Sequence, residues 1–170
     1  PMTTIDSALR AALVTLARVT VTDEDGVVHE YDEWPTGEAM EGGPVMLSWP
    51  DVAMAGETAA GAYNVVVHEF AHVLDMGDGE PNGMPPLSDK AARARWAQCL
   101  GDSYAAFCEA LDCGDHTFLD PYGAQAPEEF FAVATEAFFV QPRSLRAEHP
   151  DLYSLLAGYF QQDPALTVRE

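Results

Sequence analysis

A long apolar run in the first half of the sequence contains two histidines four residues apart: Ala59-Ala60-Gly61-Ala62-Tyr63-Asn64-Val65-Val66-Val67-His68-Glu69-Phe70-Ala71-His72-Val73-Leu74. The run contains no Pro and keeps a helical period in spite of its three consecutive valines, so we expect a buried helix with Thr58 as its N-cap. Side chains at positions i and i+4 lie on one face of a helix. His68 and His72 are therefore expected to point at a common spot, with Glu69 facing the same cleft.

The spacing of these three residues is typical of a zinc site. Two neutral imidazoles hold the ion, and the Glu69 carboxylate is placed to take a proton from a metal-bound water. The alternative is a surface helix that carries two unrelated histidines. The apolar neighbours Val65 to Val67 and Phe70 disfavour it, because it would bury two polar rings without a partner. The sequence therefore predicts a metal-binding helix.

A third metal ligand is expected on a second helix, predicted from Pro127 to Val140. A catalytic zinc uses three protein ligands and one open position, and no His follows the motif at the short interval of the metzincins. Glu129 and Glu136 share an inward face of this helix, and no Lys or Arg lies between Trp96 and Pro142 to neutralise them. Acids in a first helical turn are also favoured by the helix dipole alone. The residues leave the choice between Glu129 and Glu136 open.

Composition limits the partners and the compartment. Eight Lys+Arg against 28 Asp+Glu give a net charge of −20, which argues against binding to nucleic acid. No window approaches the roughly 18 apolar residues of a membrane-spanning helix, and no signal peptide is evident. Three cysteines without a CxxC pair fit reduced thiols. We therefore expect a cytoplasmic protein that has neither a nucleic-acid nor a membrane partner.

The pattern of elements predicts the class α+β: one mostly helical domain over residues 1–170 with a small N-terminal β-sheet. The opening Pro1-Met2 also raises the expectation of a missing N-terminal segment. Gly and Pro residues, N-cap residues and the period of the hydrophobic residues set the expected bounds of the helices and strands. They are a first helix over Thr4–Leu16, a hairpin of Arg18–Thr22 and Val27–Tyr31 that turns at Asp25-Gly26, a strand over Val45–Trp49, a helix with Ser88 as its N-cap that runs toward Leu111, and helices over Pro127–Val140 and His149–Gln161.

Several separate motifs, in order from about Val19 to Pro164, resemble one known family. The chain is similar to the Mlc titration factor A family, which are glucose-regulated zinc metallopeptidases of the gluzincin kind. A weaker likeness to the catalytic domain of anthrax lethal factor covers the histidine helix and the segment from Tyr122 to Phe131. The motifs that carry the family resemblance are Gly43-Pro44-Val45-Met46-Leu47-Ser48-Trp49, Tyr63 to Met76, Asn82-Gly83-Met84-Pro85-Pro86-Leu87, Asp120-Pro121-Tyr122-Gly123, Glu129-Phe130-Phe131-Ala132-Val133 and Glu136.

The resemblance implies a zincin-like fold and one catalytic Zn²⁺. By position it implies His68, His72 and Glu129 as the metal ligands, Glu69 as the general base and Tyr122 as a transition-state residue. From its own surroundings, Tyr122 would instead be expected to pack as a loop-closing aromatic side chain. The resemblance thus favours Glu129 over Glu136 as the third metal ligand.

Two further acids match the family without a settled role. For Glu136 we expect a contact behind the metal ligands or between helices. Asp75 lies three residues after His72, where it could orient a ligand imidazole or contact the loop that follows the helix. Both alternatives for Asp75 stay open.

The sequence predicts a zinc metallopeptidase that hydrolyses peptide bonds with a metal-activated water and Glu69 as general base. The resemblance adds aminopeptidase-like activity on peptide or protein substrates. The strand Val45–Trp49 is a candidate edge for an extended substrate, or else an ordinary core strand. The alternative function is a regulatory protein that sequesters a transcriptional repressor of the Mlc type.

Overall fold

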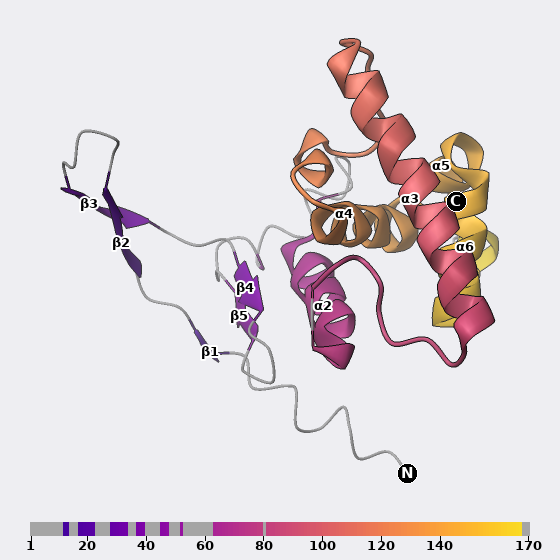
Figure 1. Cartoon of the computed structure of the whole chain (residues 1–170), viewed down its shortest axis with the longest axis horizontal. Coiled ribbons are helices and arrows are strands. Elements are labelled where there is room, and N and C mark those ends of the chain that lie inside the picture. The colour runs from indigo at the N-terminus through magenta and orange to yellow at the C-terminus, as the bar shows by residue number, and fades with distance from the viewer. Residues whose placement is uncertain are drawn as a thin grey trace.

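The computed structural model describes residues 12–13, 17–22, 28–33, 37–39, 45–47, 52, 63–79 and 81–167 (Figure 1). Five short strands come first, followed by helices. The strands are β1 (Ala12–Leu13), β2 (Ala17–Thr22), β3 (Val28–Glu33), β4 (Gly37–Ala39) and β5 (Val45–Leu47). The helices are α2 (Val65–Asp75), α3 (Lys90–Asp112), α4 (Pro127–Val140), α5 (Pro142–Glu148), α6 (Pro150–Phe160) and α7 (Pro164–Thr167), with 3₁₀ turns η2 (Met76–Asp78) and η3 (Pro121–Ala124).

The predicted class α+β with one small N-terminal sheet is wrong. Residues 63–79 and 81–167 form helices, 3₁₀ turns and loops and contain no strand. The short strands divide between two separate ladders, an antiparallel pair β2–β3 and a three-stranded β1-β5-β4. The core is built by helices that bury one another, so the mostly helical part of the prediction holds and the mixed class does not.

The N-terminal elements match the expectations only in part. The antiparallel pairing of β2 with β3 follows the predicted hairpin, whose turn at Asp25-Gly26 lies outside the described residues. The predicted helix over Thr4–Leu16 is wrong at Ala12–Leu13, which form β1, and its other residues are not described. Strand β5 pairs with β1 on one side and with β4 on the other. It is therefore the central strand of its ladder, and the predicted substrate-binding edge is not there.

Helix α2 begins six residues later than the sequence predicts. Tyr63 and Asn64 are not helical, and Asn64 has the extended backbone of an N-cap, its Oδ1 accepting a hydrogen bond from the Val67 N–H at 3.1 Å. The predicted cap Thr58 lies outside the described residues. The buried side of α2 carries Val65, His68, Glu69, Ala71 and Asp75. His68 thus lies on the face that packs against the rest of the fold, and His72, one turn further on, is partly buried.

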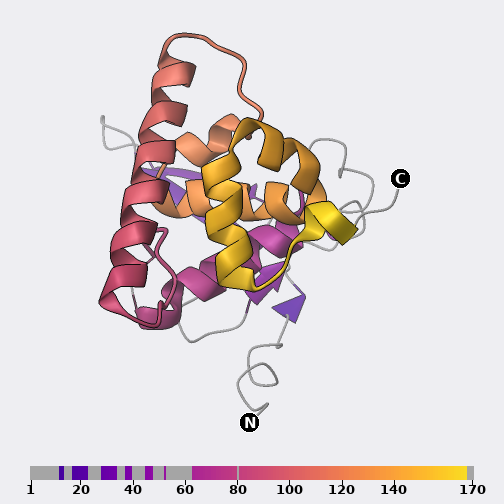
Figure 2. The same ribbon diagram turned by 90° about the vertical axis from the view of Figure 1, so that its right-hand side faces the viewer.

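Helix α4 is the centre of the helical core. Pro127 occupies its first turn, as predicted, and the nine residues from Phe130 to Phe138 are all buried. A helix that is buried all round must be covered on every side. It contacts α2, α3, α5 and α6 (Figure 1), and Figure 2 shows α5 and α6 stacked over one side of it. Fixing α4 therefore fixes the acids that it carries.

Helix α3 packs along the same core. Its N-cap is Asp89, whose Oδ1 accepts from the Ala92 N–H at 2.8 Å, and not the predicted Ser88. Trp96 lies between Phe131 and Tyr159, with ring centroids at 5.7 and 5.2 Å. These edge-on aromatic contacts join α3, α4 and α6. The buried cluster also includes Leu100, Phe107, Leu119, Phe130, Phe138, Leu145, Leu152, Tyr153 and Leu156.

The C-terminal region contains more helices than predicted. Helix α6 matches the expected last helix, but α5 and α7 were not predicted. Helices α5 and α7, like α6, begin with a Pro at the first helical position, a signal that the sequence offered. Within the described residues, no helix has the length and apolarity needed to cross a membrane.

Candidate metal centre

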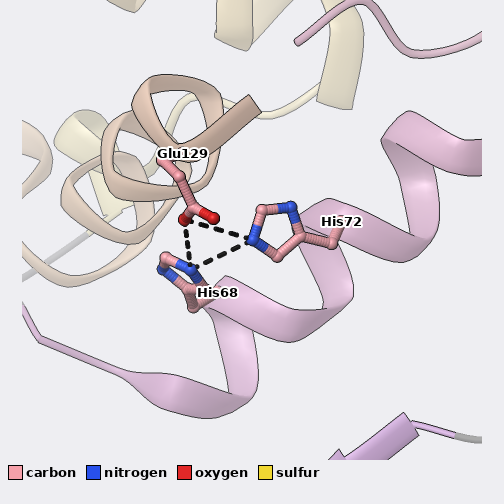
Figure 3. Close-up of side chains that lie close together, drawn as sticks. All are labelled: His68, His72 and Glu129. Atoms are coloured by element: carbon pink, nitrogen blue, oxygen red, sulfur yellow. Dashed lines mark hydrogen bonds and ion pairs between the residues drawn. The ribbon is translucent and has the colours of Figure 1, made fainter. Parts of the chain in front are cut away.

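Three side chains from α2 and α4 converge on one point (Figure 3). Nε2 of His68 lies 3.1 Å from Oε2 of Glu129 and 3.1 Å from Nε2 of His72. Nε2 of His72 lies 3.4 Å from the same Glu129 oxygen. The structure thus brings together His68 and His72 with Glu129, and the three atoms form a nearly equilateral triangle.

The size of this triangle fits a metal ion. Zinc binds His nitrogen and carboxylate oxygen at about 2.0–2.2 Å in tetrahedral geometry, which separates neighbouring ligand atoms by about 3.3–3.6 Å. The observed separations of 3.1, 3.1 and 3.4 Å are close to that spacing. Two imidazoles with one carboxylate also make a donor set that suits zinc, with one position left open. The residues present therefore fit the metal on both geometry and chemistry.

Glu136 decides which nitrogen of His68 faces this point. Its Oε1 lies 2.8 Å from Nδ1 of His68, and because a carboxylate only accepts, the hydrogen belongs to Nδ1. In the neutral ring Nε2 then carries a lone pair. That lone pair faces the Glu129 oxygen, which is also an acceptor. Two acceptor atoms at this distance require a proton or a metal ion between them.

In the metal-free site a proton lies between His68 and Glu129, and the pKa values of both residues are shifted. Burial alone would lower the pKa of His68, but its hydrogen bonds with Glu129 and Glu136 and their charges outweigh burial and raise it to about 9. Burial alone would raise the pKa of Glu129, but hydrogen bonds from His68 and His72 and their charges hold it at about 2. At neutral pH the metal-free site therefore holds one proton that a cation would have to displace.

Glu136 also ties the two helices together. Its second oxygen, Oε2, accepts a hydrogen bond from the backbone N–H of Asn64, the N-cap of α2. The side chain is nearly buried, with the residue 3% exposed. Glu136 therefore lies behind His68, on the side away from His72, and also joins α4 to α2, so it makes both kinds of contact expected from the sequence.

The two remaining predicted residues lie beside the three donors. Glu69 is buried on α2. The Tyr122 ring lies 5.9 Å from the His68 ring, centroid to centroid, and the side chain is 46% exposed. Partial burial, together with the charges of Glu129 and Glu69, raises the pKa of Tyr122. Its phenol is therefore protonated at neutral pH and open to solvent at the rim of the site.

The turn that carries Tyr122 is held against α4. Oδ1 of Asp120 accepts from the Tyr122 N–H at 2.9 Å, and the Tyr104 hydroxyl donates to the Ala124 carbonyl at 3.0 Å. Gly123 is buried, and a side chain there would contact Phe130 and Val133 of α4 at 3.4 Å. These contacts fix Tyr122 relative to the helix that carries Glu129.

Asp75 contacts the loop that follows α2, which is one of the two contacts expected for it from the sequence. Its Oδ2 accepts from the backbone N–H groups of Asn82 at 2.9 Å and Gly83 at 2.7 Å, and its Oδ1 has no hydrogen-bond partner. It therefore makes no hydrogen bond with His72. Gly83 and Asn64 were not predicted as functional residues, although an Asn just before an apolar helical run is a usable capping signal.

Comparison with known proteins gives one matching family and several similar relatives. The family described as Glucose-regulated metallo-peptidase M90 matches residues 12–161. Mlc titration factor A of Pectobacterium atrosepticum is 35% identical over 152 residues, which cover 86% of this chain and 56% of the relative. The protein of the same name from Edwardsiella ictaluri is 35% identical over 145 residues, or 84% of this chain and 54% of the relative.

A third relative is also similar. An uncharacterised protein of Synechocystis is 39% identical over 148 residues, which cover 86% of this chain and 54% of that protein. The chain thus spans about half the length of the curated relatives it matches.

Proposed function

Because this chain belongs to the glucose-regulated metallo-peptidase M90 family, we propose that it is a zinc-dependent peptidase of the cytoplasm, aminopeptidase-like in its action on peptides. The family supports a metallopeptidase-type function, and the donor set supports a bound metal ion. In this proposal Zn²⁺ is held by His68, His72 and Glu129. When bound, the ion supplies Lewis-acid polarisation of a carbonyl and lowers the pKa of water.

Glu69 is the proposed general base. It follows His68 directly on α2 and is buried, and its charge contributes to the raised pKa of Tyr122, whose ring lies beside that of His68. A base in that position accepts the proton of the attacking water and later passes it to the leaving amine. Glu69 is not one of the three converging donors, so its removal should affect the rate and leave metal binding in place.

Tyr122 is proposed to stabilise the oxyanion that develops on the carbonyl. Its raised pKa keeps the hydroxyl protonated and able to donate. A donor aimed at a developing negative charge strengthens as the charge forms. The exposure of this ring is what a residue that meets a substrate needs, whereas a purely packing role would favour burial.

One observation carries the proposal: His68, His72 and Glu129 present three donor atoms at the spacing of a tetrahedral metal. The test is turnover of chromogenic peptides by zinc-loaded wild type and by Glu69→Gln. We expect Glu69→Gln to keep its zinc and melting temperature but lose ~10²–10⁴ in kcat. Glu128→Gln, on α4 beside the site, is the control for the loss of one negative charge. Undiminished cleavage by Glu69→Gln would remove it from the mechanism.

A second function is supported by the name Mlc titration factor A that several relatives carry. As the alternative, we propose that the chain binds and sequesters a transcriptional repressor of the Mlc type. Binding to such a repressor, measured by calorimetry, should then be equal for wild type and Glu69→Gln, with no peptide turnover by either. In both functions we expect no binding to DNA, because the net charge is −20.

A further inference from the structure

The C-terminal end of α2 is joined to the start of α4 by the backbone of a loop. Asp75, the last residue of α2, is fully buried, and its Oδ2 accepts two hydrogen bonds from Asn82 and Gly83. The Gly83 carbonyl in turn accepts from Nε1 of Trp96 on α3 at 2.8 Å. Gly83 is thereby held from both sides, by α2 and by α3.

Gly83 rests directly on the first residue of α4. Its φ is +77°, and a Cβ built there would lie 2.6 Å from the Pro127 carbonyl oxygen and 2.9 Å from Cδ2 of Leu100. The oxygen belongs to backbone, so it cannot move aside as a flexible side chain would. An approach of 2.6 Å would have to open to at least 3.4 Å to become an ordinary contact. Only a glycine lets the loop and α4 come this close.

This contact lies next to two of the three donors. Glu129 follows Pro127 by two residues, in the first turn of α4, and His72 precedes Asp75 by three residues, one turn back on α2. One side of the donor triangle runs from Nε2 of His72, near the end of α2, to Oε2 of Glu129, at the start of α4. It measures 3.4 Å and is the longest of the three sides. A metal site tolerates deviations of only about 0.2 Å in its ligand distances.

We propose that Asp75 and Gly83 are positioning residues that set the distance between Glu129 and His72, and thereby the affinity and geometry of the metal site. The inference rests on the proposed metal site, and it adds a determinant outside the donor set. Asp75 holds the loop, and Gly83 transmits the position of α2 to the first turn of α4. Widening the contact at Gly83 would draw Glu129 away from the two histidines.

The test uses the full chain with Zn²⁺ and Co²⁺ as probes, and compares Gly83→Ala with Gly114→Ala. Both glycines have φ near +77°, but a Cβ at Gly114 meets nothing within 4 Å. The two substitutions thus share the backbone strain and differ in the contact. We expect Gly83→Ala to weaken Zn²⁺ binding by about 10–100-fold, the scale for residues behind metal ligands, and to alter the visible absorption spectrum of bound Co²⁺. Gly114→Ala should change neither.

A second pair of variants covers the case in which Gly83→Ala does not fold. Asp75→Ala removes the acceptor of both loop N–H groups and should weaken metal binding, whereas Asp75→Asn keeps an acceptor oxygen and should restore most of it. Wild-type affinity and an unchanged Co²⁺ spectrum in Gly83→Ala and Asp75→Ala, with only a lower melting temperature, would overturn the inference. Wild-type protein that binds neither ion would instead show that the proposed metal site itself is wrong.

Discussion

Helices α2 and α4 face each other across the site but contribute to it in different ways. On α2, His68, Glu69 and His72 fall within one and a half turns, so the helix itself fixes their mutual positions. On α4, Glu129 and Glu136 reach two opposite nitrogens of the same His68 ring. Whether these two carboxylates reach His68 depends on how α4 packs against α2. One half of the site is therefore local in sequence, and the other half exists only in the folded core.

The largest expected effect comes from removing one donor from either helix. His72→Ala and Glu129→Ala should each lose most of the bound zinc, because each leaves only two of the three donors. Elemental analysis after dialysis against metal-free buffer measures the loss. Glu136→Ala should keep more zinc than either. If Glu129→Ala retains wild-type zinc while Glu136→Ala does not, the roles of the two acids on α4 are reversed.

The same contrast explains what the sequence could predict. The helical spacing of His68 and His72 is a local property, and the prediction that both point at one spot agrees with the structure. The inward face of Glu129 and Glu136 was also predicted, because residues seven apart lie on one side of a helix. Both acids do contact His68. Which nitrogen each one reaches depends on the register of α4 against α2, and helical periodicity does not contain that register.

The errors in the fold have a similar cause. Alternating residues predicted a β-hairpin, and β2 and β3 do pair, but alternation gives no information on which strands join one sheet. The class α+β failed because the core is completed by helices packed around α4. Likewise, β5 was predicted as a candidate edge, and its pairing with β1 and β4 involves residues far away in the sequence. Short-range patterns locate elements, and long-range packing assigns their neighbours.

The second prediction concerns Tyr122, which lies on neither helix and reaches the site through η3. Tyr122→Phe removes the hydroxyl and keeps the ring, so the contact with the His68 ring is retained. We expect kcat for chromogenic peptides to fall by ~10²–10³, the scale for loss of one oxyanion donor. Zinc content and melting temperature should be nearly unchanged. A variant that turns over normally, or one that loses rate only along with its metal, would return Tyr122 to a structural role.

The third prediction tests the side of His68 that faces away from the metal position. Glu136→Gln keeps one acceptor oxygen for two donors, the Nδ1–H of His68 and the N–H of Asn64. We expect zinc affinity to fall by about 10–100-fold, measured by competition with a coloured chelator. Glu128→Gln is the matched control on the same helix. Equal affinities in the two variants would mean that Glu136 serves α2 only as a helix cap.

The smallest effect, about tenfold for each pH unit, is a dependence of zinc affinity on pH. In the metal-free protein the pKa of His68 is about 9, so at neutral pH its ring carries a hydrogen on both nitrogens. Zinc needs the Nε2 lone pair and must displace that proton. Because the fraction of deprotonated rings grows tenfold per pH unit below the pKa, affinity should rise about tenfold from pH 6.5 to pH 7.5 and level off above 9.

Calorimetry in buffers of different ionisation enthalpy checks this, since about one proton should leave His68 for each zinc bound at pH 7. The result also sharpens the comparison between the helices. The hydrogen bonds with Glu129 and Glu136 on α4, together with the charges of these two acids, raise the pKa of the histidine on α2. Glu136→Gln removes one of them, so the pKa of His68 should fall toward its ordinary value, and zinc affinity should level off at a lower pH. A variant with the wild-type pH dependence would mean that Glu136 does not control the protonation of His68.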